Sequence, residues 1–268
     1  MWPDRRLLDL FRIEHPILLS PMAGAMDTEL AIAVANAGGL GALRAGMLGP
    51  EQVRAQVAQF RAATAAKPIN LNFLAHKMPV PNNQREDAWR EKLKPYYAEL
   101  GVDPGAPVLV TNRLPFNSAM CAVIEQLKPE VLSFQYGLPD AEVVKRIREL
   151  GSKVICSATT VAEARFLEKN GCDAIVAQRL EAGGHRGMFL SDDLATQVGL
   201  FTLVPQIIDA VNVPVIASGG IADGRGIVAA FALGAAAVPA VPGINDPAAT
   251  PRGVANGASR QYGAHQCL

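Results

Sequence analysis

The feature that most constrains the fold is an alternation of short apolar runs with longer stretches of helical period. This order is typical of repeated strand–helix units built around a parallel sheet. The apolar runs predict seven strands, at residues 16–21, 40–43, 68–73, 131–134, 153–157, 174–177 and 213–218. At 268 residues and 50% hydrophobic content, the chain is long enough for one large core. We therefore expect an α/β protein with a single (β/α)₈ TIM barrel.

Three of the intervening helices have recognisable ends. They are predicted at residues 28–36, 140–150 and 160–170, and each begins at a polar residue and stops at or just before glycine. Such ends match the preferences of helix caps. Local signals and the repeated strand–helix order therefore agree.

Two segments depart from this order. Residues 77–129 form a long excursion rich in Pro, Asn and charge, which predicts a loop and an exposed helix inserted over the barrel mouth as a lid. Residues 239–268 have no strand or helix period, and Pro239 and Pro242 each lack a backbone donor. We expect a barrel domain over 1–238, an incomplete last βα unit and an irregular tail over 239–268.

Composition excludes several classes of protein. The chain has 25 Lys and Arg against 25 Asp and Glu, so no net charge favours nucleic acid or an anionic membrane. The N-terminus has only short, charge-interrupted apolar runs, which predict neither a signal peptide nor a membrane span. Four cysteines without CxxC spacing indicate neither zinc nor a disulfide framework, and Cys156 and Cys172 are expected to be buried. We expect a cytoplasmic protein that binds small molecules.

Candidate site residues lie at predicted strand ends, where barrel active sites are built. In Pro21-Met22-Ala23-Gly24, small residues would let a planar ring lie against the backbone, although a tight turn explains the motif equally well. Asn70 and Asn72 are two amides on one face of an apolar strand. They match the polar edge of a flavin, or they are core amides bonded to backbone.

The most informative segment is CDAIVAQRLEAGGHRG, residues 172–187, which runs from a strand into a loop. Gly183 and Gly184 allow close approach of the backbone to a ligand, and His185 follows immediately. Histidine has the proton affinity nearest neutrality, so His185 is the candidate for proton transfer beside an oxidisable carbon. The alternative is a structural histidine.

A further candidate loop follows VIAS in VIASGGI, residues 215–221. Backbone N–H groups of Gly219 and Gly220, next to Ser218, could cradle a phosphate, which many barrels bind after their seventh strand. The position of this motif, one unit after the His185 loop, strengthens the interpretation.

Together, PMAG, INLNFLAH, VLSFQYGLP, the EAGGHRG loop and VIASGGI resemble the ordered motifs of the nitronate monooxygenases, formerly called 2-nitropropane dioxygenases. The resemblance covers residues 13–238. It implies a TIM barrel that binds FMN and no metal, acting on a nitronate or nitroalkane with oxygen. By the same resemblance His185 is the catalytic residue and the amide of Gln178 contacts the flavin.

The resemblance also implies which residues surround the flavin. Met22 and Ala23 would line it, Asn72 rather than Asn70 would bond to it, and three glycines would lie along its ring and phosphate: Gly183, Gly219 and Gly220. Three departures from the family pattern bear on this. Arg179 stands where a small residue is usual, Gln135 replaces a histidine at a pocket wall, and after Val238 the usual glutamine and Gly-Thr pair are missing.

Two other functions fit the sequence. An NAD(P)H-dependent flavin reductase of a quinone or enoyl thioester would share the PMAG and GGH motifs, although no GxGxxG follows a strand. Alternatively, the altered tail leaves an inactive, partly folded product, because losing one of eight strands exposes two sheet edges.

Overall fold

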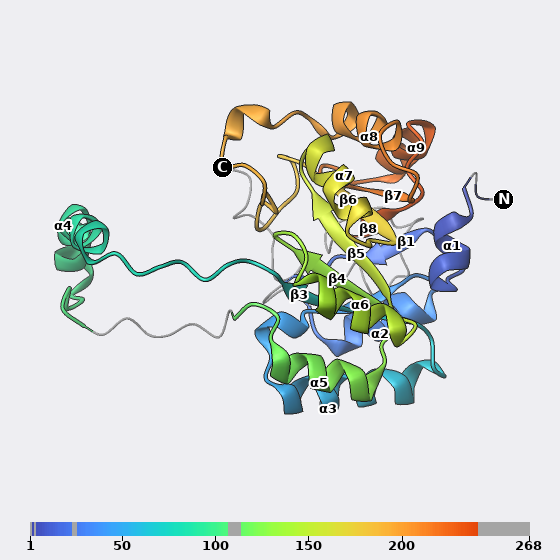
Figure 1. Cartoon of the computed structure of the whole chain (residues 1–268), viewed down its shortest axis with the longest axis horizontal. Coiled ribbons are helices and arrows are strands. Elements are labelled where there is room, and N and C mark those ends of the chain that lie inside the picture. Colours follow the sequence, from blue (N-terminus) through green and yellow to red (C-terminus); the bar gives the residue numbers. More distant parts are fainter. Residues whose placement is uncertain (1, 3, 23–25, 107–113, 241–268) are drawn as a thin grey trace.

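Eight parallel strands alternate with helices in the computed structural model, which describes Trp2 and residues 4–22, 26–106 and 114–240 (Figure 1). The strands are β1 (Ile17–Leu19), β2 (Gly41–Leu43), β3 (Ile69–Leu74), β4 (Val131–Gln135), β5 (Lys153–Ala158), β6 (Ala174–Gln178), β7 (Val215–Ser218) and β8 (Val238–Ala240). The α-helices are α1 (Arg6–Phe11), α2 (Thr28–Asn36), α3 (Pro50–Thr64), α4 (Asn83–Leu100), α5 (Ser118–Leu127), α6 (Ala141–Glu149), α7 (Val161–Lys169), α8 (Leu200–Ile208) and α9 (Gly224–Ala232). Two short 3₁₀ helices are η1 (Ala45–Met47) and η2 (Leu194–Thr196).

The strands form a closed ring. Strands β2 to β7 pair in chain order, and β1 pairs with β8. Isolated bridges join the two groups, Leu18 with Leu40 on one side and Ile216 with Ala237 on the other. The predicted (β/α)₈ barrel is confirmed.

Two of the three predicted helices begin with a side-chain cap, whereas Asp140 at the start of α6 makes no such hydrogen bond. Helix α2 has the predicted bounds, and the side chain of Asp27 accepts a hydrogen bond from the Leu30 backbone. Thr160 caps α7 in the same way, by accepting from the backbone N–H of Glu163. All seven predicted strands are also present, with ends that differ by a few residues.

The expectation that residue 239 onward would form no strand is wrong for residues 239 and 240. Strand β8 pairs with β1 in the register Ile17↔Val238, and the Val238 N–H donates to the Pro16 carbonyl at 3.1 Å. Backbone groups of successive strand residues face opposite neighbours, so the absent N–H of Pro239 falls on the β7 side. The pairing with β7 has already ended at the Ala237 bridge, so Pro239 removes no hydrogen bond between strands. The predicted tail over 241–268 lies outside the described residues.

Two apolar layers support the ring. Inside the barrel, a cluster joins strand residues such as Leu18, Val131 and Ile155 to the buried side chains of α1. Between the strands and the outer helices, a larger cluster includes Phe60 and Phe134, both almost fully buried. Helix α1 therefore fills one end of the barrel interior and leaves the other end for the site.

The excursion between β3 and β4 is divided into two different parts. Helix α5 buries four residues and packs against α3 and α6, so it belongs to the helix layer of the barrel. Helix α4 buries none of its residues and lies apart from the barrel in Figure 1. The predicted exposed helix is present as α4, whereas the lid over the barrel mouth and the insertion at 77–129 stay predictions.

Cys121, Cys156 and Cys172 are free and buried, as expected for the latter two. Burial raises the pKa of the Cys156 and Cys172 thiols. Among the described residues, no helix is both long and apolar enough to cross a membrane.

Candidate active site

Toward the carboxyl ends of the strands, the barrel interior changes from apolar to polar. Register places Asn72 beside Ser133, and Ser133 beside the interior residue Ile155. Gln178 pairs with Ser218 at the ends of β6 and β7. A barrel closed by apolar side chains at one end and lined by amides and hydroxyls at the other is arranged to bind a polar ligand at its carboxyl-terminal mouth.

The two asparagines lie at different depths on this inner face. Asn72 is half-buried near the mouth, and its Nδ2 donates to Ser133 Oγ at 3.0 Å. Asn70 lies one layer deeper and is 3% exposed, and its Oδ1 has no hydrogen-bond partner. An unpartnered buried acceptor is costly, so Asn70 has capacity for a donor that the described residues do not supply.

Two glutamines hold the backbone of the His185 loop. The carbonyl of His185 accepts from Gln178 Nε2 at 2.9 Å and from Gln135 Nε2 at 2.8 Å. Gln178 Oε1 in turn accepts from the Gly187 N–H at 2.8 Å. The side-chain amide of Gln178 therefore binds the loop backbone in this structure, and the flavin contact implied for it stays a prediction. Gln135 was expected at a pocket wall, but its role as a clamp depends on a contact across 50 residues that the sequence does not reveal.

The imidazole of His185 is exposed at the mouth, next to a run of ring contacts. Its ring centroid lies 6.3 Å from that of Tyr136, and Tyr136 lies 6.1 Å from His76, both edge to face. Tyr136 has a φ of 68°, a conformation that is uncommon for a bulky residue. Strain of this kind concentrates at functional sites. Sequence reasoning identified His185 but neither His76 nor the conformation of Tyr136.

The glycines of the two predicted loops have different surroundings. A Cβ at Gly183 or Gly184 would meet no heavy atom within 4 Å, so the backbone there has free space beside it. A Cβ at Gly219 would lie 2.9 Å from the Ala182 nitrogen, and Gly219 has a φ of 131°. Gly220 approaches Glu181 similarly. The Gly219–Gly220 turn therefore allows the β7 and β6 loops to meet.

The remaining predicted residues are placed less fully. Met22 is half-buried, and its N–H donates to the Met26 sulfur at 3.0 Å. Ala23 lies outside the described residues. Ser218 is half-buried at the end of β7, and its carbonyl accepts from the Arg179 N–H at 3.2 Å.

Arg179 points away from the barrel interior. It follows the inward-facing Gln178, and its Nη1 donates to the carbonyl of Thr159 at the end of β5. Arg179 is 2% exposed, and burial lowers its pKa from the usual value. Arg179, which stands where the family usually has a small residue, therefore keeps its guanidinium out of the barrel interior.

A buried carboxylate beside Arg179 was not identified from the sequence. Glu163 is 1% exposed, and its Oε2 accepts from the backbone and hydroxyl of Thr159. Its Oε1 accepts from the backbone N–H groups of Phe189 and Leu190. Glu163 thus holds the far end of the His185 loop, and its only sequence signal is its position at the start of a helix.

The fold and the site define a (β/α)₈ barrel with a histidine-bearing loop over a polar carboxyl-terminal mouth, the end where barrel enzymes place their active sites. Comparison with known families makes this specific. The family model described as Nitronate monooxygenase matches residues 4–240, so the chain belongs to the nitronate monooxygenase family.

Individual relatives agree with this assignment. A nitronate monooxygenase of Paraburkholderia phytofirmans is 42% identical over 87% of this chain and 64% of its own length. One of Pseudomonas aeruginosa is 39% identical over 87% of this chain and 66% of its own length. The chain therefore spans less than two thirds of the length of these curated relatives.

Two solved structures are similar to this chain in both sequence and fold. Nitroalkane oxidase from Streptomyces ansochromogenes is 35% identical, with a TM-score of 0.75 over 89% of this chain and 67% of that one. FabK from Thermotoga maritima is 33% identical, with a TM-score of 0.64 over 89% of this chain and 61% of that one.

Proposed function

We propose that this chain oxidises alkyl nitronates to carbonyl compounds and nitrite, using FMN and oxygen, with His185 at the reaction centre. The observation that carries the proposal is the position of His185. Two amides from different strands clamp its backbone over the polar mouth of the barrel. Membership in the nitronate monooxygenase family supports the substrate class.

Residues at the mouth and one layer below it suit a flavin. Asn70 Oδ1 is a buried acceptor without a partner, so it can receive a ring N–H. Gly183 and Gly184 leave free space where other residues would place a side chain, which allows a planar ring to approach the backbone. Asn72, Gly219 and Gly220 are proposed to complete the binding surface, with the two glycines toward the phosphate.

In this proposal the protein supplies position and charge. His185 donates a hydrogen bond to a nitro oxygen of the anionic substrate, and its proton compensates that negative charge. Gln135 and Gln178 fix the path of the loop, so the imidazole projects from a backbone that cannot shift freely. A bound flavin supplies the electron acceptor that reacts with oxygen.

The test replaces His185 with asparagine in the full chain. We expect His185→Asn to retain the flavin content of the parent and to lose turnover of a primary alkyl nitronate by on the order of 10² or more, as expected when a positioned proton donor is lost. Flavin content is read from the absorbance spectrum, and turnover from nitrite release.

Two outcomes would contradict the proposal. Loss of flavin in parallel with activity would make His185 a structural residue. Rapid bleaching of the flavin by NADH, without turnover of nitronate, would instead support a flavin reductase.

A further inference from the structure

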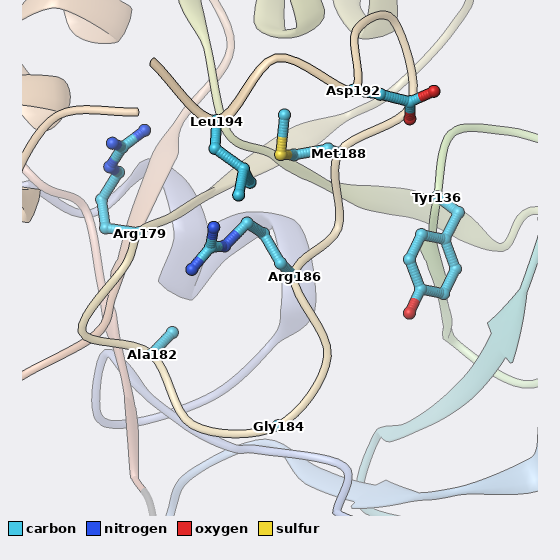
Figure 2. A pocket seen from close by; sticks show the side chains of 8 residues that line it. All are labelled: Tyr136, Arg179, Ala182, Gly184, Arg186, Met188, Asp192 and Leu194. Carbon is cyan, nitrogen blue, oxygen red and sulfur yellow. The ribbon is translucent and has the colours of Figure 1, made fainter. Parts of the chain in front are cut away.

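A pocket lies against the loop that carries His185 and is lined by residues on both sides of that histidine in the chain. Its volume is about 400 Å³. Figure 2 shows that the loop descends from Arg179 through Ala182 and Gly184 and returns through Arg186 and Met188. The remaining lining residues are Tyr136, Asp192 and Leu194. We call this the loop pocket.

One wall of the loop pocket is a buried guanidinium with unused donors. Arg179 Nη1 is bonded to the Thr159 carbonyl, which fixes the plane of the group. Its Nε and Nη2 are buried and have no hydrogen-bond partner among the described residues. These two nitrogens form one edge of the guanidinium, with two parallel N–H bonds. That edge matches two oxygens held on a planar anion.

A second guanidinium faces the same pocket. Arg186 is half-buried and forms no hydrogen bond or ion pair within the described part of the chain. Burial and the charge of Arg186 lower the pKa of Arg179, whereas the carboxylates of Glu181 and Glu163 raise it, so Arg179 and Arg186 repel each other with only partial compensation. Asp192 also lines the pocket, but it lies beyond ion-pair distance of both arginines. The lining therefore holds two cations and one anion, without internal pairing.

We propose that the loop pocket binds a small planar oxoanion, whose two oxygens accept from Nε and Nη2 of Arg179 while Arg186 supplies a second positive charge. Carboxylate and nitrite share this shape. An oxoanion satisfies the orphaned donors of Arg179 and offsets the repulsion between the two cations. Lysine at position 179 would keep the charge but lose the two-pronged edge. The inference concerns binding alone and holds whether or not the proposed oxidation occurs.

The test measures the thermal midpoint of the full chain during titration with sodium acetate or sodium nitrite. Sodium chloride at matched ionic strength is the control for a general salt effect. We expect a saturable rise with acetate, nitrite or both, because a ligand that binds only the folded state stabilises it. A response to nitrite alone would identify nitrite as the ligand, and a response to acetate would identify a carboxylate.

Substitutions assign the effect to the loop pocket. Arg179→Lys is expected to raise the dissociation constant at least tenfold, and Arg186→Gln to raise it several-fold. Arg225→Lys is the matched control, because Arg225 is 93% exposed on α9 and pairs with Asp223. Its dissociation constant should equal that of the parent.

Three results would overturn the inference. They are the absence of saturable stabilisation by either oxoanion, equal stabilisation by chloride, and unchanged affinity in Arg179→Lys. Circular dichroism checks that Arg179→Lys is folded. If Arg179→Lys is not folded, the titration of Arg186→Gln is the test, and an unchanged dissociation constant in that variant overturns the inference.

Discussion

At the scale of single residues, the carbonyl of His185 is the point where three parts of the chain meet. A carbonyl oxygen has two lone pairs, and Gln135 from β4 and Gln178 from β6 use both. Because the two amides come from different strands, the carbonyl cannot rotate away from one without losing the other. The loop position of His185 therefore depends on the barrel rather than on local sequence.

Gln178 should contribute more to this arrangement than Gln135. Gln178→Leu removes the acceptor of the buried Gly187 N–H as well as one bond to His185, and an orphaned buried donor costs about 1 to 3 kcal/mol. We expect lower stability in denaturant and faster amide hydrogen exchange at Gly187. Gln135→Leu is the control, because it leaves the Gly187 bond intact and should not accelerate exchange there. Equal exchange rates in both variants would show that Gln178 does not hold the loop.

At the scale of elements, the features that depend on neighbouring residues in the chain could be predicted from the sequence. Helices α2 and α7 begin at residues whose side chains cap them, and both were predictable from the sequence. Strand β8 was not, because proline lowers the strand preference of its own residue whatever its neighbours do. Whether the missing donor matters depends on the side that Pro239 faces, which only the register with β1 decides.

The candidate site, too, could be predicted from the sequence only in part. The strand-end positions of Asn72, Gln178 and His185 follow from the alternation of strands and helices, because barrel sites gather at one end. The clamp from Gln135, the anchor at Glu163 and the outward direction of Arg179 do not. Each depends on a contact between residues far apart in the chain, for which a single sequence carries no signal.

Helix α4 is weakly coupled to the barrel, because it buries none of its residues. Trp89 on α4 is 54% exposed, whereas Phe60 on α3 is fully buried. We expect Trp89→Ala to leave the free energy of unfolding within about 0.5 kcal/mol of the parent, as for most surface substitutions. Phe60→Ala should reduce it by about 3 to 5 kcal/mol, because it leaves a cavity in the core. Urea denaturation checks both, and a large loss in Trp89→Ala would show that α4 is covered in solution.

At the scale of the whole molecule, the barrel depends on joining the two ends of the described chain. Strand β1 lies near the N-terminus and β8 is the last described element, and they pair directly. The other side of β8 is held to β7 at Ala237, whose carbonyl accepts from the Ala217 N–H at 3.0 Å. Without this closure, β1 and β7 would each present an unpaired edge, which promotes association between chains.

The joint at Ala237 allows a direct test of closure. Ala237 is fully buried within the inner apolar cluster, so Ala237→Asp would place a carboxylate without a partner inside the barrel. Burying an unpaired charge costs several kcal/mol, a large share of the roughly 5 to 15 kcal/mol that stabilises a typical domain. We expect Ala237→Asp to lose its cooperative thermal transition and to elute as aggregates in size-exclusion chromatography. Val228→Asp adds the same charge to α9 at a position that is 68% exposed and should elute like the parent. An Ala237→Asp protein with the elution volume and thermal midpoint of the parent would show that the fold does not require closure at β8.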